Sequence, residues 1–398
     1  MSTARANNLD LMPPPAVRTI QQRSLMIGGG ATVLALIGLI VNRDEFFHAY
    51  LTAYMAWLGV TLGCMAMLMV IHMTGGAWGM VIRRMLEAGV RTLPLMAVLF
   101  VPLIFAINHL YRWAHPERFA GDAHLAQLSH QYLSTTGYIL RSVLYFALLL
   151  VLAYFLNKYS VEQDSPPERD LSPRFRVIAG PGLIVYGFAA SFAVIDWVMS
   201  ISAPWISTIY PLIFIAGQCL SAMCFVVVVE SILARRSPMM LLLKPKEVQD
   251  HGKLILTWVM LWAYFSFSQF LITWAGNLPE EISWYTRRLY NGWGWIPLWL
   301  VLFHFAVPFA LLLSRTFKRR TETLMWLAAW LMVMRYLDLF WFIEPNYHEN
   351  LYASWQFIVM PFAIGGFWLW LYFRNLGSRP LLPLYDPNSR SVLEPEHE

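Results

Sequence analysis

The sequence predicts an all-α integral membrane protein with ten transmembrane helices. Of its 398 residues, 58% are hydrophobic and only 13% are charged, whereas roughly 25% of the residues in soluble domains are charged. Ten apolar runs are long enough to cross the hydrocarbon core of a bilayer, which takes about 20 helical residues. The runs are continuous and do not alternate with a period of two, so helices are favoured over the strands of a membrane barrel.

The first four expected spans follow an N-terminal arm, residues 1–23. The arm contains three consecutive prolines. No small-residue cleavage pattern follows a short apolar core, so we expect the first run to stay in the protein as a span. The first four spans are expected at 24–41, 49–73, 91–113 and 136–157.

The other six spans follow a loop, residues 158–176, whose Pro and charged residues are typical of a flexible connector. They are expected at 177–200, 208–233, 252–275, 294–314, 323–343 and 354–375. Residues 24–375 therefore form one transmembrane domain. The C-terminal tail, residues 376–398, is expected to be an extended arm that needs a partner surface to become ordered.

The distribution of Lys and Arg predicts the orientation, because cytoplasmic loops carry an excess of these residues. With the N-terminus inside, the inner segments hold 22 Lys and Arg and the outer segments only 5. Both termini are therefore expected in the cytoplasm. This asymmetry accounts for the formal net charge of +5, so no nucleic-acid partner is expected.

The sequence predicts no metal or cofactor bound by this chain. Cys64, Cys219 and Cys224 all lie within expected spans, where thiols usually act as small apolar side chains. The chain has no CxxC and no four-cysteine cluster spacing. His109 and His304 are the best candidates for a haem pair, but no second pair accompanies them.

The expected spans contain charged residues away from their ends, among them Arg141, Asp196, Arg335 and Asp338. Each would cost about 2.5–3.5 kcal/mol at the bilayer centre, so they must be paired or hydrated. Arg335 and Asp338 are three residues apart and can meet across one helical turn. Two interpretations stay open: structural ion pairs that tie helices together, and the outer mouth of a proton or quinone-linked path.

Further polar residues extend the candidate proton path. His304 is expected near the middle of span eight, and Gln218 and Glu230 are the groups available on the inner half. For Glu230 the sequence favours a solvated helix end with a local pair to Arg235 or Arg236, and the proton path is the alternative. The proton-path candidates are Arg141, Asp196, Gln218, Glu230, His304, Arg335 and Asp338.

Several stretches together resemble one family of membrane subunits. They are INHLYRWAHPE, FAVIDWVMSISAPWISTIYP, and FLITWAGNLPEEISWYTRR with the following NGWGW. They are similar to the NrfD or polysulfide-reductase type, and in particular to the second of the two such subunits of alternative complex III, a bacterial quinol:cytochrome c (or other electron carrier) oxidoreductase. The resemblance covers roughly residues 24–375, and NLPEEISWY is its most specific part.

This resemblance implies an NrfD-like fold in which the central eight helices form two four-helix bundles. A parallel duplication agrees with Asp196 and Asp338, which lie about one turn below the outer ends of spans five and nine. The expected partners are the homologous NrfD-like membrane subunit, a periplasmic iron–sulfur subunit and c-type cytochrome subunits, within the bacterial inner membrane. Iron–sulfur clusters and c haems are then expected in those partners, and this chain would border a quinol or quinone site.

Site residues follow from the same resemblance. His109 and Asp196 have the residue types and depth of a quinol pocket described for the sister subunit, and Gln269 belongs to the same layer. These three are the quinone-proximal candidates. The exterior segment 273–288 is expected to dock a peripheral redox subunit, through Asn277, Glu280, Glu281, Trp284, Tyr285, Arg287 and Arg288.

Two other functions remain as alternatives. A secondary transporter would line an internal cavity with the same charges, but such proteins often break their helices at matched points of two repeats, and Pro94, Pro102, Gly217 and Pro308 are not matched. A structural scaffold that anchors redox partners is the second alternative. No residue of this chain is expected to be catalytic.

Overall fold

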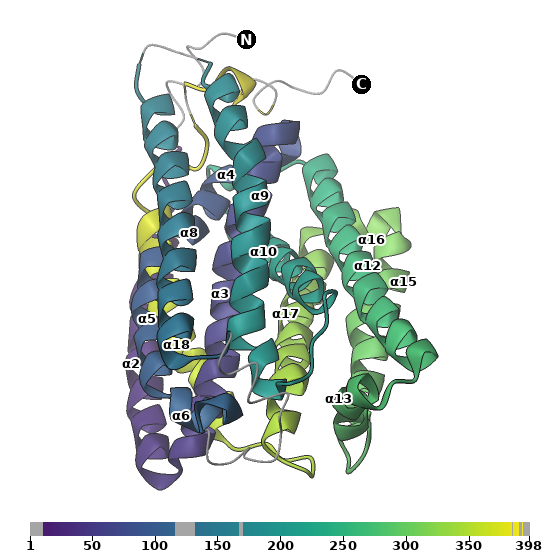
Figure 1. The fold of residues 1–398 in the computed structure, drawn as a ribbon. Coiled ribbons are helices and arrows are strands. Elements are labelled where there is room, and N and C mark those ends of the chain that lie inside the picture. The colour runs from purple at the N-terminus through teal and green to yellow at the C-terminus, as the bar shows by residue number, and fades with distance from the viewer. Residues whose placement is uncertain (1–10, 116–131, 167–169, 384, 390–391, 393–398) are drawn as a thin grey trace.

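The computed structural model describes residues 11–115, 132–166, 170–383, 385–389 and 392. Every regular element in these ranges is helical (Figure 1). Ten helical segments are long and apolar enough to cross a membrane, which confirms the predicted number of spans. The chain is therefore a multi-pass, all-helical membrane protein.

Long helices make up most of the spans. They are α2 (Ala16–Val41), α3 (Arg43–Thr74), α4 (Ala77–Val90), α5 (Leu93–Phe105), α8 (Thr135–Gln163), α9 (Ser172–Trp197), α10 (Tyr210–Leu233), α12 (Pro245–Gly276), α17 (Thr321–Ile343) and α18 (Gln356–Leu376). The eighth span is divided into α14 (Trp295–Trp299), a π-helical segment η4 (Leu300–Ala306) and α15 (Val307–Leu313). Shorter elements are α6 (Ile107–Leu110), η1 (Arg112–Ala114), η3 (Met199–Ser202), α11 (Met239–Leu242), α13 (Pro279–Leu289), α16 (Arg315–Arg319), η5 (Glu344–Asn346) and η6 (Pro387–Ser389).

Helices α3 and α10 form the centre of the molecule. In each, 83% of the apolar window is buried, against 22% in α2 and α12. The two helices pack on each other, and a glycine permits their close approach: a Cβ at Gly63 would lie 2.0 Å from the carbonyl oxygen of Gln218. Small residues at such contacts let helix backbones approach in membranes, where packing replaces the hydrophobic effect as the driving force.

The other spans surround this centre in two groups. On one side α3 packs against α5 and α9, and α8 packs against both α5 and α9; on the other side α10 packs against α12 and α17, and α12 packs against α15. Helices α2 and α18 pack along each other, with Gly28 facing Gly366, where an added Cβ would lie 2.9 Å from the opposite backbone. In Figure 1, α12, α13, α15 and α16 lie together on the right.

Two predicted boundaries are wrong. The third span covers Ala77–Phe105 rather than 91–113, because the segment expected as a cytoplasmic loop is the helix α4. Its charged side chains Arg83, Arg84 and Glu87 pair with one another and are buried. The first span begins at Ala16, inside the predicted arm.

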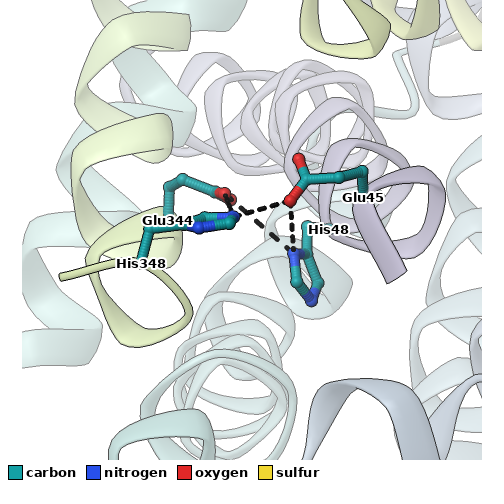
Figure 2. A group of neighbouring side chains, drawn as sticks. All are labelled: Glu45, His48, Glu344 and His348. Atoms are coloured by element: carbon teal, nitrogen blue, oxygen red, sulfur yellow. Dashed lines mark hydrogen bonds and ion pairs between the residues drawn. The ribbon is translucent and has the colours of Figure 1, made fainter. Parts of the chain in front are cut away.

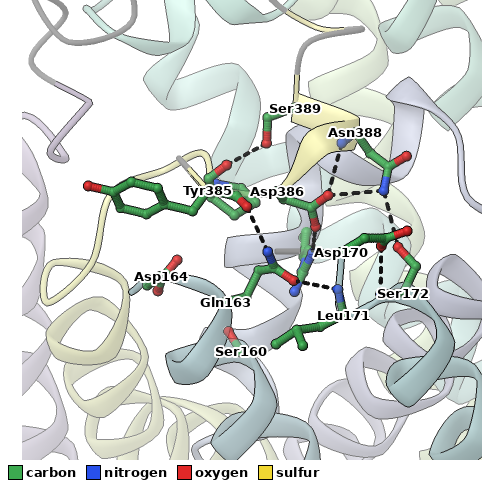
Figure 3. Close-up of polar contacts among 12 residues, drawn as sticks. Ser160, Gln163, Asp164, Asp170, Leu171, Ser172, Tyr385, Asp386, Asn388 and Ser389 are labelled. Carbon is green, nitrogen blue, oxygen red and sulfur yellow. Dashed lines mark hydrogen bonds and ion pairs between the residues drawn. The ribbon is translucent and has the colours of Figure 1, made fainter. Parts of the chain in front are cut away.

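The described part of the C-terminal tail packs on the chain's own helices (Figure 3). Leu382 is fully buried, Arg83 Nη1 donates to Asp386 Oδ2 at 2.7 Å, and Gln163 Nε2 donates to the Tyr385 carbonyl at 2.8 Å. Residue Leu381 also donates its backbone N–H to the carbonyl of Leu11 at 2.9 Å, so the two described ends of the chain meet. The prediction that the tail needs a partner to become ordered is wrong for these residues.

Asp386→Asn is expected to loosen the tail. Because Arg83 and Asp386 are 2% and 5% exposed, losing one partner of this pair should cost about 1–3 kcal/mol. Limited proteolysis of the purified chain should then cleave the tail faster. Asp250→Asn, which breaks a surface pair with Lys253 at the same end, should leave the rate unchanged; equal rates for Asp386→Asn and the unaltered chain would contradict the proposed anchoring.

Candidate functional site

A buried ion pair on α17 forms the centre of the candidate site. Arg335 and Asp338 pair across one helical turn, as the sequence predicts, and their side chains are 5% and 1% exposed. The indole Nε1 of Trp262 on α12 donates to Asp338 Oδ2 at 3.0 Å. The guanidinium fits against α10 because residue 217 is glycine: a Cβ there would lie 2.3 Å from Arg335 Cζ. The pair therefore connects three spans.

A cavity of about 660 Å³ lies beside this ion pair. Aromatic and aliphatic side chains from α12, α13, α14, η4 and α17 form most of its wall. The polar exceptions include Asp338, Gln269 and Ser266, whose hydroxyl has no hydrogen-bond partner among the described residues. Tyr264 and Phe267 in the wall are more than half exposed, so the cavity opens toward the surface that faces lipid. Its volume is that of a ligand pocket, roughly 300–1,000 Å³.

The His304 ring stacks on the indole ring of Trp262, the residue that donates a hydrogen bond to Asp338. Their ring centroids are 4.2 Å apart and the planes are inclined by 13°. His304 is fully buried, and neither ring nitrogen has a hydrogen-bond partner among the described residues. It lies in η4, and π-helical segments are rare and often mark functional sites. Three predicted proton-path residues, His304, Arg335 and Asp338, therefore gather around Trp262.

The second predicted pair lies elsewhere, between α8 and α9. Arg141 binds Asp196 through two hydrogen bonds of 2.8 and 3.0 Å, and Tyr145 donates a third to the same carboxylate at 2.7 Å. The Arg141 guanidinium also covers the Tyr132 ring at 3.8 Å. Asp196 is fully buried, whereas the Arg141 side chain is 22% exposed. This arrangement satisfies the carboxylate and agrees with a structural tie between two helices.

The three quinone-proximal candidates are not brought together. Gln269 lines the cavity beside Asp338. His109 instead pairs with Asp44 at 2.6 Å and stacks on Phe47, and Asp196 is held by Arg141. Of the three candidates, only Gln269 lines this cavity.

The inner polar residues also make contacts that the sequence did not predict. Gln218 Oε1 accepts a hydrogen bond of 2.7 Å from Tyr186. Glu230 is fully buried and pairs at 2.9 Å with His251 of α12, whose other ring nitrogen lies 2.9 Å from the Trp78 carbonyl. The favoured prediction, a solvated helix end with a local pair from Glu230 to Arg235 or Arg236, is wrong, since Glu230 is fully buried and pairs with His251, and Arg235 pairs with Glu322.

The predicted docking residues divide into a buried and an exposed set. Trp284 stacks on Trp205, and Arg288 is fully buried above the Trp284 ring and donates to the Phe342 carbonyl at 2.8 Å. Burial lowers the pKa of Arg288 to about 9. These two residues hold α13 on the bundle, and their buried side chains expose little surface to a partner. Of the others, Tyr285 and Glu281 are half-buried, whereas Asn277, Glu280 and Arg287 are exposed.

The exposed charges of α13 border a second, polar cavity of about 350 Å³. Glu280, Glu281 and Arg287 line it together with Arg112 and Asn346. Several of its lining residues belong to α13, which lies with α6 at the end of the molecule opposite the described chain ends (Figure 1). This surface therefore carries acidic and basic side chains around a cavity.

Sequence reasoning missed a cluster at the same end of the molecule. Glu45 and His48 lie in the first turns of α3, and Glu344 and His348 follow α17; their side chains converge (Figure 2). Proximity to Glu344 and Glu45 raises the pKa of His348 to about 9. The available signal was the spacing: in each pair a carboxylate precedes a histidine by three or four residues, the separation that brings two side chains together on a helix.

No protein-family model matches this chain, and no curated protein matches it in sequence.

Proposed function

We propose that this chain is a membrane subunit of a quinol:electron-acceptor oxidoreductase, with cytochrome c as the expected class of acceptor, and that it borders a quinone site. The observation that carries the proposal is the lipid-facing cavity beside Asp338 and Gln269. A quinone combines a long apolar tail with a ring that carries two carbonyl oxygens. The cavity offers aromatic walls for the tail and ring, and a few polar groups to orient the head, as ligand sites generally do.

The polar groups of the cavity suit the two oxidation states of such a ligand. The Gln269 amide can donate to a quinone carbonyl or accept from a quinol hydroxyl. The Asp338 carboxylate can accept a proton that a quinol hydroxyl releases, with Arg335 and Trp262 holding it in place. The electrons leave to the iron–sulfur and haem centres that the family resemblance implies in partner subunits. His304, stacked on Trp262, extends this set toward a proton path.

The proposal also includes two helix bundles, an orientation in the membrane and a docking end for the partner subunits. Packing of α3, α5, α8 and α9 on one side, and of α10, α12, α15 and α17 on the other, supports two four-helix bundles. The excess of Lys and Arg at the end with both described termini supports a cytoplasmic location for them in a bacterial inner membrane. The opposite end, with α13 and its charged hollow, is then periplasmic and docks the iron–sulfur and cytochrome subunits.

Co-purification tests the proposal. A tagged chain extracted from its own membrane in a mild detergent should carry c-haem absorbance, iron–sulfur electron paramagnetic signals and quinol:cytochrome c reductase activity. Reversing the charges of α13 with Glu280→Lys and Arg287→Glu should lower the co-purified haem about tenfold, while Lys253→Glu at the other end should not. Isolation of the intact chain without redox centres or associated quinol activity would refute the function.

A further inference from the structure

We propose that Glu45, His48, Glu344 and His348 bind a divalent first-row transition-metal ion. Their ligand atoms lie within 4.8 Å of one another. The site joins the start of α3 to the segment after α17, so the metal would connect two parts of the chain about 300 residues apart in sequence. This proposal does not depend on quinone binding, because none of the four residues lines the cavity beside Asp338.

Metal binding would require only small movements of the four side chains. His348 Nε2 lies 2.6 Å from Glu45 Oε1 and 3.2 Å from Glu344 Oε1, and His48 Nδ1 lies 4.0 Å from each of the same oxygens. Ligand atoms around a zinc ion at about 2.0–2.2 Å are roughly 3.3 Å apart. Side-chain shifts of less than about 1 Å would therefore complete a four-ligand shell. In Figure 2 the four side chains point toward a common centre.

Unpaired buried atoms provide a second, independent observation. Glu344 is fully buried; its Oε1 has only the ion pair with His348 at 3.2 Å, and its Oε2 has no hydrogen-bond partner among the described residues. The same holds for Glu45 Oε2 and for His48 Nδ1, on side chains that are 5% and 7% exposed. Buried charges in proteins are normally paired or bound to a metal. A divalent cation would supply the missing partner.

The His48 ring is already held in position for such a role. It stacks on Tyr347 with ring centroids 3.6 Å apart and the ring planes inclined by 11°. Metal-binding histidines typically use one ring nitrogen for the metal while the other bonds a backbone carbonyl or carboxylate. The stacking on Tyr347 fixes the plane of the His48 ring, and its Nδ1 atom, which lies among the carboxylates, has no hydrogen-bond partner among the described residues.

The ligand set defines the class of metal. Two imidazoles and two carboxylates suit Zn²⁺, Mn²⁺ or Fe²⁺, whereas Mg²⁺ and Ca²⁺ prefer oxygen ligands alone. Four protein ligands leave no obligatory open position, which is typical of structural rather than catalytic sites. The His348 side chain, 31% exposed, provides the route of entry.

Metal titration of the purified full-length chain tests the proposal. After treatment with a chelator, the chain should bind one Zn²⁺ or Mn²⁺ ion, measured by elemental analysis, and its thermal midpoint should rise with metal but not with Ca²⁺. Glu344→Gln and His48→Asn should each weaken binding at least about tenfold. Glu344→Gln should also abolish the rise of the thermal midpoint with metal.

Matched controls lie at the other end of the molecule. Glu247 is a buried glutamate with one unpaired oxygen, and His72 is a buried histidine stacked on Phe175 with one unpaired nitrogen. Glu247→Gln and His72→Asn should leave metal binding intact. Failure of the unaltered chain to bind either ion, or equal binding by Glu344→Gln and His48→Asn, would overturn the proposal.

Discussion

Replacing Asp338 by asparagine is expected to lower the free energy of unfolding by about 3–5 kcal/mol, the cost of leaving one member of a buried ion pair without its partner. Arg335 is 4% exposed and is enclosed by Phe214, Gly217 and Asp338. Its guanidinium cannot reach water when the carboxylate is lost. Denaturant titration of the purified chain in mixed micelles, followed by tryptophan fluorescence, measures the change.

The ion pair between Arg141 and Asp196 supplies the control for Asp338→Asn. Asp196→Asn should cost less, about 1–3 kcal/mol, because the Arg141 side chain is 22% exposed and keeps its bond to the Tyr132 carbonyl. Replacing both Arg335 and Asp338 by leucine should recover much of the loss, since buried pairs and apolar residues of similar volume often have similar stability. If Asp338→Asn costs no more than Asp196→Asn, the buried ion pair does not hold α17 in place as described.

Filling the cavity with Ala263→Phe is expected to weaken quinone binding at least about tenfold, or about 1.4 kcal/mol. Ala263 lines the cavity one residue from Trp262, so a benzyl group there would occupy space that the quinone ring needs. The substitution does not alter Asp338, Arg335 or Gln269. Equilibrium binding of labelled short-chain ubiquinone and menaquinone analogues to the purified chain measures the effect.

Ala275→Phe is the matched control, because Ala275 is exposed near the end of the same helix and is not part of the cavity wall. It should leave quinone affinity unchanged. Gln269→Leu should weaken binding of the head group without closing the cavity. Unaltered affinity in Ala263→Phe, with a normal unfolding midpoint, would show that quinone binds elsewhere.

The number of spans was predictable because each apolar run carries its own signal. The segment around Arg83, Arg84 and Glu87 misled the boundary prediction, since charged residues that pair inside the protein have the same composition as a solvated loop. The burial of Trp284 and Arg288 against the bundle could not be predicted from the sequence either. Whether an aromatic or basic residue of an amphipathic helix faces the protein or a partner depends on tertiary packing, which one chain's local pattern does not specify.

The candidate site was predictable only where its residues are neighbours in sequence. Arg335 and Asp338 could be paired from a spacing of three residues, and the charges inside the spans required partners. Trp262 and His251 contribute from another helix, α12, and no local pattern indicates which face of α12 they occupy. Glu45 and Glu344 meet only because α3 and α17 pack together, although each carries a histidine at helical spacing.

Photolabelling tests the central claim most directly, namely that a quinone occupies the cavity beside Asp338. A photoreactive quinone analogue would be cross-linked in native membranes and the labelled peptides of this chain identified by mass spectrometry. The account predicts labels in residues 260–270 of α12 and 297–305 around η4, suppressed by excess quinone and by Ala263→Phe. Labels confined to the helices around His109 and Asp196, or specific labelling only of other subunits while this chain remains unlabelled, would contradict it.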